Sequence, residues 1–119
     1  LGRAATEIAS LLIGKDKVNK VPNFDCGDNV IVLNSDKIKV TGNKMKDKVY
    51  SRHTGYAKGL RQETLENLLK RDSRMVIRYA VINMLPNNKL RDSMITRLNI
   101  YKDENHPHVA QKPIEIKLK

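Results

Sequence analysis

A short apolar run at residues 29–33, with the sequence Asn-Val-Ile-Val-Leu, constrains the fold of this chain more than any other segment. β-Branched residues favour strands, and a strand that is apolar at consecutive positions buries both faces, as in the centre of a parallel sheet. In the preceding residues 1–13, apolar side chains recur with a period of 3.6, which predicts a helix ended by Gly14. A helix followed by a buried strand is half of a βαβ unit. The pattern therefore predicts an α/β fold with a further strand upstream of Leu1.

The rest of the chain predicts more short strands and helices separated by turns. Strands are expected at residues 37–41, with one face in water, at 49–50 and at 100–101. Helices are expected at residues 64–71, from Asp72 or Ser73 to about Met84, and at 90–98. In each helix apolar residues recur every three or four positions, and Asp or Ser can cap the second one.

Length and composition indicate one domain. A chain of 119 residues with 39% hydrophobic content can bury a core without a disulfide or a metal. We expect residues 1–102 to form the α/β domain, and the polar residues 103–119 to form an extended tail that is an edge strand or is held by a partner. The single cysteine, Cys26, cannot form an internal disulfide and favours a reducing compartment. The sequence contains no apolar run near the roughly 18 residues of a membrane span and no visible signal peptide.

Residues 37–61 are too polar to be a core and carry most of the charge. They hold eight Lys or Arg side chains and one acid, a net charge of +7 out of +10 for the whole chain. Such concentrated charge, beside glycines that let backbone N–H groups approach a partner, is typical of a surface for a polyphosphate. A plain solvated loop is disfavoured because the cations repel one another unless a partner supplies counter-charge. An anionic membrane is also disfavoured, since the segment is interrupted by glycines and lacks an amphipathic helix.

Nucleic acid is therefore the expected partner, and its candidate contacts fall into groups. The cations expected to bind phosphates are Lys44, Lys46, Lys48, Arg52, Lys58 and Arg61. The glycines at which the backbone can approach the partner are Gly42, Gly55 and Gly59. Sugar or base contacts are expected from His53, Thr54 and Tyr56, although Tyr56 is equally consistent with packing, and packing is favoured for Tyr50. Second and third basic faces are expected at Lys89, Arg91 and Arg97 and at Lys15 and Lys17.

The sequence gives little support for catalysis, a cofactor or a metal. The Gly-x-x-x-x-Gly-Lys-Ser/Thr and Gly-x-Gly-x-x-Gly motifs of nucleotide-binding loops are absent. His106 and His108 have no cysteine near them and are a weak metal set. Cys26 has no triad partner in the sequence, and His53 lies among cations, so hydrogen bonding to phosphate or ribose is favoured over catalysis for His53. We expect no catalytic residue, no cofactor, no metal and no small-molecule substrate.

Short motifs occur in a fixed order along nearly the whole chain. They are Leu1-Gly2-Arg3, Asp25-x-Gly27-Asp28, Val40-Thr41-Gly42-Asn43-Lys44, Asp47-Lys48-x-Tyr50, His53-Thr54-Gly55-Tyr56, Met84-Leu85-Pro86, Leu98-x-Ile100-Tyr101, His106 and Ala110-Gln111-Lys112-Pro113. In these motifs the chain resembles the L-thirteen family of large-subunit ribosomal proteins, in its bacterial form.

The resemblance implies a three-layer α/β/α domain around a mainly parallel four-stranded sheet, whose first strand precedes Leu1. It also implies a structural protein that binds large-subunit ribosomal RNA early in assembly and has no enzymatic activity. The implied partners are that RNA and neighbouring large-subunit proteins, with no membrane, in the cytoplasmic ribosome of a bacterium or, alternatively, in an organellar ribosome. An RNA-binding regulator outside the ribosome and a small RNA-processing nuclease are the other functions that the same basic surface would suit.

Two positions depart from the family pattern. Lys58-Gly59 stands where the family commonly has Gly-Gly, so the loop path should differ locally if the first glycine needs a positive φ; Lys58 would add a phosphate contact. Asn83 stands where the family commonly has glycine before Met-Leu-Pro, and we expect little change because asparagine tolerates the left-handed conformation.

Overall fold

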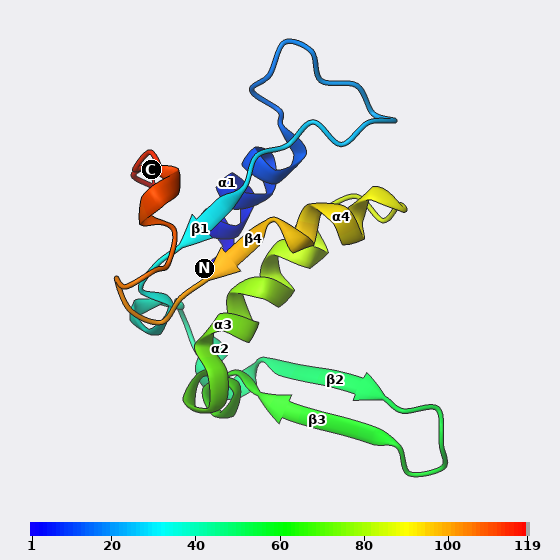
Figure 1. Ribbon diagram of the computed structural model, residues 1–119. Coiled ribbons are helices and arrows are strands. Elements are labelled where there is room, and N and C mark those ends of the chain that lie inside the picture. Colours follow the sequence, from blue (N-terminus) through cyan, green and yellow to red (C-terminus); the bar gives the residue numbers. More distant parts are fainter. Residues whose placement is uncertain (119) are drawn as a thin grey trace.

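Two small sheets organise the chain in the computed structural model, which describes residues 1–118 (Figure 1). A parallel pair joins β1 (Val30–Val32) to β4 (Leu98–Ile100), and an antiparallel pair joins β2 (Val49–His53) to β3 (Leu60–Thr64). The helices are α1 (Gly2–Ile13), α2 (Lys44–Asp47), α3 (Leu65–Met84) and α4 (Leu90–Thr96), with 3-10 turns η1 (Ser35–Lys37) and η2 (Val109–Gln111). The fold is mixed α/β, as predicted, but the described strands form two two-stranded sheets and not one four-stranded sheet.

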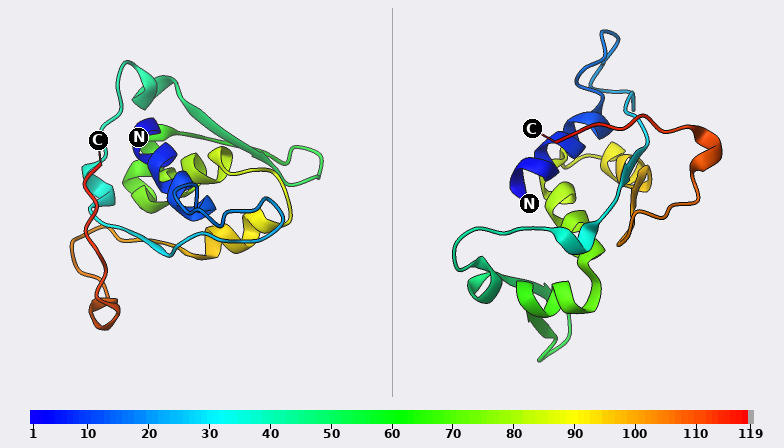
Figure 2. Two further views of the ribbon diagram at one scale, coloured as in Figure 1. Left: turned by 90° about the horizontal axis from the view of Figure 1, so that it is seen from above. Right: turned by 90° about the vertical axis from the view of Figure 1, so that its left-hand side faces the viewer.

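Strand β1 confirms the strand predicted at residues 29–33, with a difference in burial. Its three residues are half-buried, whereas burial on both faces was predicted. It pairs only with β4 among residues 1–118, from Val30 opposite Leu98 to Val32 opposite Ile100. Helices α1 and α3 lie on one side of this pair (Figure 2). One neighbouring strand and one helical layer cover only part of each side chain, which accounts for the half-burial.

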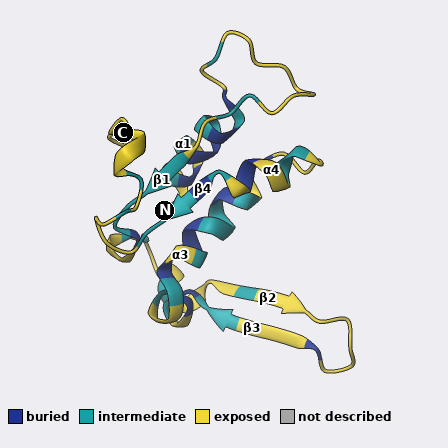
Figure 3. Ribbon diagram, in the orientation of Figure 1, coloured by how far each residue is buried: buried dark blue, intermediate teal, exposed yellow. Residues whose placement is uncertain are grey.

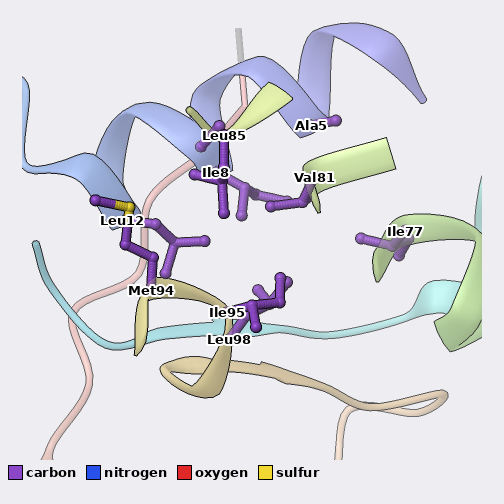
Figure 4. Packing of buried hydrophobic residues seen from close by; sticks show 10 residues of the cluster. Ala5, Ile8, Leu12, Ile77, Val81, Leu85, Met94, Ile95 and Leu98 are labelled. Carbon is purple, nitrogen blue, oxygen red and sulfur yellow. The ribbon is translucent and has the colours of Figure 1, made fainter. Parts of the chain in front are cut away.

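The main core lies between α1, the second half of α3, α4 and β4 (Figure 4). Helix α1 ends where predicted, because Gly14 takes the left-handed conformation, with a φ of 76°, and donates to the carbonyls of Ser10 and Leu11. The buried residues of this core are Ala5, Ile8, Ala9, Leu12, Ile77, Val81, Leu85, Met94, Ile95 and Leu98. No aromatic side chain is among them, so branched aliphatic residues and methionine fill the space.

Helix α3 contains the break that the sequence predicts near residue 72. Asp72 has non-helical angles, φ −159° and ψ 101°, and its carboxylate accepts a hydrogen bond from the Arg74 N–H at 3.1 Å, which caps the second half of the helix. The hydrogen bond from the Arg74 side chain holds the pKa of the Asp72 carboxyl below its ordinary value. The first half starts at Thr64, whose Oγ1 accepts from the Asn67 N–H. Among residues 1–118, no helix combines the length and apolar character needed to cross a membrane.

A second, smaller core lies beside the break in α3 and takes residues from both halves of the helix. Its buried residues are Leu65, Leu68 and Val76, and Met45, Tyr50 and Tyr79 pack against them. This cluster holds the base of the β2–β3 hairpin, whose outer part projects from the body and is almost wholly exposed (Figure 3). Because α3 contributes to both cores, its two halves connect the hairpin to the body.

The strand predicted at residues 37–41 is wrong, and the cause is a long-range contact. Residues 35–37 form η1 instead, and no strand follows at 38–41. Ser35 is buried, and its Oγ lies 2.8 Å from Oγ of Ser73 in α3, which in turn donates to the Asp36 carboxylate at 2.5 Å. These bonds attach the turn to the break in α3, and residues 38–41 have no partner strand in the described part of the chain.

Two further boundaries differ from the sequence prediction. The helix predicted at 90–98 ends at Thr96 because β4 begins at Leu98, two residues before the predicted strand. The tail beyond residue 103 contains η2 and no strand as far as residue 118. Near its start, the Tyr101 hydroxyl lies 2.7 Å from Nε2 of His108, whose Nδ1 lies 2.7 Å from the Gln111 side-chain oxygen. Of the two arrangements predicted for the tail, the edge strand is therefore wrong for the residues described.

Replacing Leu12 with alanine should lower the free energy of unfolding by about 2–5 kcal/mol, because the side chain is fully buried in the main core and its loss leaves a cavity. Urea denaturation followed by circular dichroism measures this change. Leu118→Ala makes the same substitution at an exposed position and should change stability by less than about 0.5 kcal/mol. Equal effects of the two substitutions would contradict the placement of the core.

Candidate nucleic-acid interface

The basic segment forms an ordered arm from Lys44 to Thr64. It begins with the single helical turn α2, continues as β2, reverses over residues 54–59 and returns as β3. The two strands pair in antiparallel register, from Val49 opposite Thr64 to His53 opposite Leu60. The sequence did predict a strand at 49–50, but not that it continues to His53 or pairs with the residues after Gly59. The arm is therefore held in shape by main-chain hydrogen bonds, and most of its side chains remain exposed.

The turn at the tip of the arm depends on two unusual positions. The Thr54 N–H donates to the Gly59 carbonyl, and the Gly59 N–H donates to the Tyr56 carbonyl. A Cβ at Gly59 would lie 2.1 Å from the Thr54 hydroxyl oxygen and 2.8 Å from the Tyr56 carbonyl oxygen, so the turn requires glycine there. Lys58 has a positive φ of 59°, the conformation expected of the first glycine in the family's Gly-Gly pair. The turn is thus formed with lysine in a glycine conformation.

The predicted phosphate-binding cations are all exposed on the arm. Lys44, Lys46, Lys48, Arg52, Lys58 and Arg61 extend from α2 to β3, with one acid, Asp47, among them. Arg52 lies directly opposite Arg61 in the ladder, and such like-charged pairs destabilise a hairpin. Among residues 1–118, no carboxylate forms an ion pair with either arginine. This arrangement calls for an anion from outside the chain.

The tip presents the side chains predicted to contact sugars or bases. Nδ1 of His53 accepts a hydrogen bond from the Gly55 N–H at 2.9 Å, so in the neutral ring the proton is on Nε2, which can donate to a partner. Thr54 is exposed, and Tyr56 is 79% exposed, so packing inside the protein does not account for its ring. Gly55 has a positive φ of 87° and open space around it, as has Gly42, with a φ of 67°. Backbone approach at these glycines is therefore unobstructed.

Tyr50, by contrast, packs as the sequence predicts. Its ring lies 5.7 Å from the ring of Tyr79, and Nζ of Lys48 lies 5.4 Å from its centroid. Burial raises the pKa of the Tyr50 hydroxyl. Tyr50 therefore joins the arm to α3 and is not free to bind a partner at the tip.

The second and third predicted faces are smaller than the arm. Lys89 is exposed and Arg91 half-buried at the start of α4. Lys15 is exposed after α1, while Lys17 forms a 2.6 Å ion pair with Asp28. Half of the third face is therefore already neutralised within the chain.

Arg97, which was predicted to belong to the second basic face, is turned toward the protein interior. Its guanidinium donates to the carbonyls of Gly27, at 2.5 Å, and Leu12, at 2.9 Å, and forms an ion pair with Asp25. A Cβ at Gly27 would lie 1.7 Å from the Leu12 carbonyl oxygen, so glycine lets this loop approach the end of α1. Arg97 thus connects the residue 25–27 loop to the body, and we leave it out of the proposed interface.

The structure also brings together residues that sequence reasoning did not select. A concave pocket of about 690 Å³ lies between the hairpin and α3. Tyr50, Arg52, Arg61 and Glu63 line it from the hairpin, and Asn67, Arg71, Tyr79 and Asn83 line it from α3. Asn83 is helical, so its replacement of the family's glycine needs no left-handed conformation. Apart from alternation in the strands, no sequence signal could have placed α3 beside this face.

The residues considered for catalysis or metal binding are engaged in other contacts. His106 and His108 stack with their centroids 6.1 Å apart, and Nδ1 of His106 accepts from the His108 N–H. Cys26 is half-buried, and its Sγ lies 3.9 Å from the Asn19 carbonyl oxygen. Within residues 1–118, no three His, Cys, Asp or Glu side chains are grouped so that they could hold a metal ion.

A family model and several known proteins match this chain, and all of them give the same family. The family model described as "Ribosomal protein L13" matches residues 1–107. Large ribosomal subunit protein uL13 of Maridesulfovibrio salexigens is 51% identical over 113 residues, which cover 95% of this chain and 80% of that protein. The protein of the same name from Desulfitobacterium hafniense is 48% identical over 95% of this chain and 79% of that protein. The one from Hahella chejuensis is 46% identical over 99% of this chain and 83% of that protein.

Replacing Arg97 with methionine should destabilise the fold by about 1–3 kcal/mol, because two carbonyls and the Asp25 carboxylate lose their donor while partly buried. Thermal unfolding monitored by circular dichroism would show the loss as a lower midpoint. Arg91→Met on α4 is the matched control and should shift the midpoint much less. Similar midpoints for both variants would show that the internal contacts of Arg97 do not stabilise the fold.

Proposed function

This chain belongs to the ribosomal protein L13 family, and on that basis we propose that it is a structural constituent of the large ribosomal subunit that binds large-subunit ribosomal RNA and supports early subunit assembly. Members of this family are structural proteins, not enzymes. We place the chain in the bacterial cytoplasmic ribosome, with an organellar ribosome as the alternative, and expect neighbouring large-subunit proteins as further partners.

The observation that carries the proposal is the exposed cationic arm. The arm, from α2 to β3, carries six predicted phosphate contacts, and its projecting hairpin places two arginines without acidic partners opposite each other. Such an arm is suited to enter a folded RNA. Roughly six phosphate contacts release enough counterions to change affinity about a thousandfold between 50 and 200 mM salt on a duplex. The electrostatic term supplies affinity, and the fixed shape of the arm limits which RNA surfaces it fits.

The body supplies the second part of the mechanism. The second core fixes the base of the arm, while Lys89 and Arg91 at the start of α4 and Lys15 beyond α1 lie on other elements. A protein that binds RNA through several separate faces favours the one RNA arrangement that reaches all of them. This is the physical basis we propose for a role in assembly.

We also propose that the parallel β1–β4 pair is part of a mainly parallel four-stranded sheet in a three-layer α/β/α domain, with a strand upstream of Leu1, as the family resemblance implies. The half-burial of the apolar β1 supports this, because another strand or layer would cover the side chains that the described residues leave partly exposed.

Replacing Lys44, Lys48 and Arg52 together with alanine should weaken binding to the protein's own large-subunit RNA about tenfold or more at 0.1 M salt. It should also reduce the slope of log affinity against log salt by about 2–3, since each lost phosphate contact removes about 0.7–0.9. Filter binding across a salt series measures both quantities.

The matched control replaces two lysines and one arginine outside the proposed faces: Arg3, Lys112 and Lys117. This variant has the same net charge as the test variant and should keep the wild-type slope. An unchanged slope in the arm variant, or equal losses in both variants, would refute the assignment of the arm as the RNA-binding face.

A further inference from the structure

The pocket between the hairpin and α3 combines an aromatic floor with a cationic rim. In a β-strand alternate residues share a face, so Tyr50 and Arg52 of β2 and Arg61 and Glu63 of β3 lie on the same face of the hairpin. The contacts of Tyr50 with Tyr79 and of Glu63 with Arg71 show that this face is turned toward α3. The face therefore forms one wall of the pocket, and α3 forms the other.

The floor consists of two tyrosine rings supported by the second core. Their centroids are 5.7 Å apart and their planes differ by 33°. Both rings are half-buried and pack against Leu65, Leu68 and Val76, which limits their movement. Lys48 lies near the Tyr50 ring, whereas no cation lies over the Tyr79 ring within residues 1–118. Tyr79 is therefore the better platform for a planar group.

The rim carries positive charge that the protein does not neutralise. Arg52 and Arg61 face each other across the two strands without an acidic partner. The one carboxylate that lines the pocket, Glu63, is paired with Arg71 at 3.0 Å. Two opposed guanidinium groups are unfavourable unless an anion lies between them, and guanidinium binds phosphate oxygens in bidentate geometry.

The shape and the chemistry together specify the occupant. A volume of about 690 Å³ is within the range of pockets for small organic groups, and the amides of Asn67 and Asn83 on the wall can hydrogen-bond to the edge of a base. An aromatic platform beside phosphate-binding arginines is the chemistry that holds unpaired nucleotides. A base within a duplex cannot enter such a pocket, so the nucleotide has to be unstacked, as in a bulge or a loop.

We propose that this pocket receives one unpaired nucleotide of RNA, with its phosphate between Arg52 and Arg61 and its base stacked on Tyr79. The inference rests on the proposed function and goes beyond it, because it assigns a site for a flipped-out nucleotide as well as a surface for backbone phosphates. An acidic peptide of a neighbouring protein is the competing occupant. If such a peptide fills the pocket, RNA binding by this chain does not depend on the two tyrosine rings.

The test measures the affinity of three variants for the protein's own large-subunit RNA, transcribed in vitro. Tyr79→Leu should bind about 5- to 150-fold more weakly, the range that corresponds to one lost stacking interaction, and Tyr79→Phe should stay close to wild type because the ring is kept. Arg61→Gln should weaken binding and lower the salt slope by about 0.7–0.9. Val109→Ala, at an exposed position in η2 outside the pocket and the proposed basic faces, is the control and should bind like wild type.

The possible outcomes distinguish failure of the pocket from failure of the proposed function. If the wild-type chain does not bind the RNA, the proposed function fails and the inference fails with it. If the wild type binds but Tyr79→Leu and Arg61→Gln bind as tightly as Val109→Ala, the pocket is refuted while the proposed function stands. Loss in only one of these two variants also overturns the proposal, because the site requires both stacking and phosphate binding. Arg61 is exposed on the hairpin, away from both cores, so its variant remains informative even if Tyr79→Leu unfolds.

Discussion

The rest of the structure depends on the burial of one helix, α3, in two separate apolar clusters. Its second half contributes Ile77 and Val81 to the main core and Val76 to the smaller core, which the first half closes with Leu65 and Leu68. The break at Asp72 separates the two halves of the helix, and the buried hydroxyl contact of Ser73 with Ser35 holds the chain at that break. Without this shared helix, the hairpin would have no fixed direction relative to the body.

That arrangement separates stability from binding. The body is stabilised by aliphatic packing and by internal polar contacts such as those of Arg97, whereas the arm carries exposed cations along α2 and the β2–β3 hairpin. Mutual repulsion of those cations works against the isolated arm, so an RNA that neutralises them stabilises the arm as it binds. The positive φ of Lys58 and the crowded Gly59 show that the tip forms a tight turn with lysine where the family commonly has glycine.

Local signals in the sequence predicted α1 with its glycine end, the strand β1, the helix break near Asp72 and the basic character of the arm. Features that depend on distant residues were not predictable. The hairpin requires the pairing of residues 49–53 with 60–64. The absence of the strand predicted at 37–41 follows from the contact of Ser35 with Ser73. The internal position of Arg97 requires the carbonyls of Gly27 and Leu12 to lie beside it. The pocket under the hairpin appears only once α3 is placed, because its two tyrosines are 29 positions apart in the sequence.

We propose that the cationic arm is embedded in ribosomal RNA in the native particle. Acetylation of lysines in purified large subunits, compared with the free protein and read by mass spectrometry, tests this most directly. We expect Lys44, Lys46, Lys48 and Lys58 to be strongly protected in the particle, although all four are exposed in the free chain. Equal reactivity of these lysines in the particle and in the free protein would contradict it.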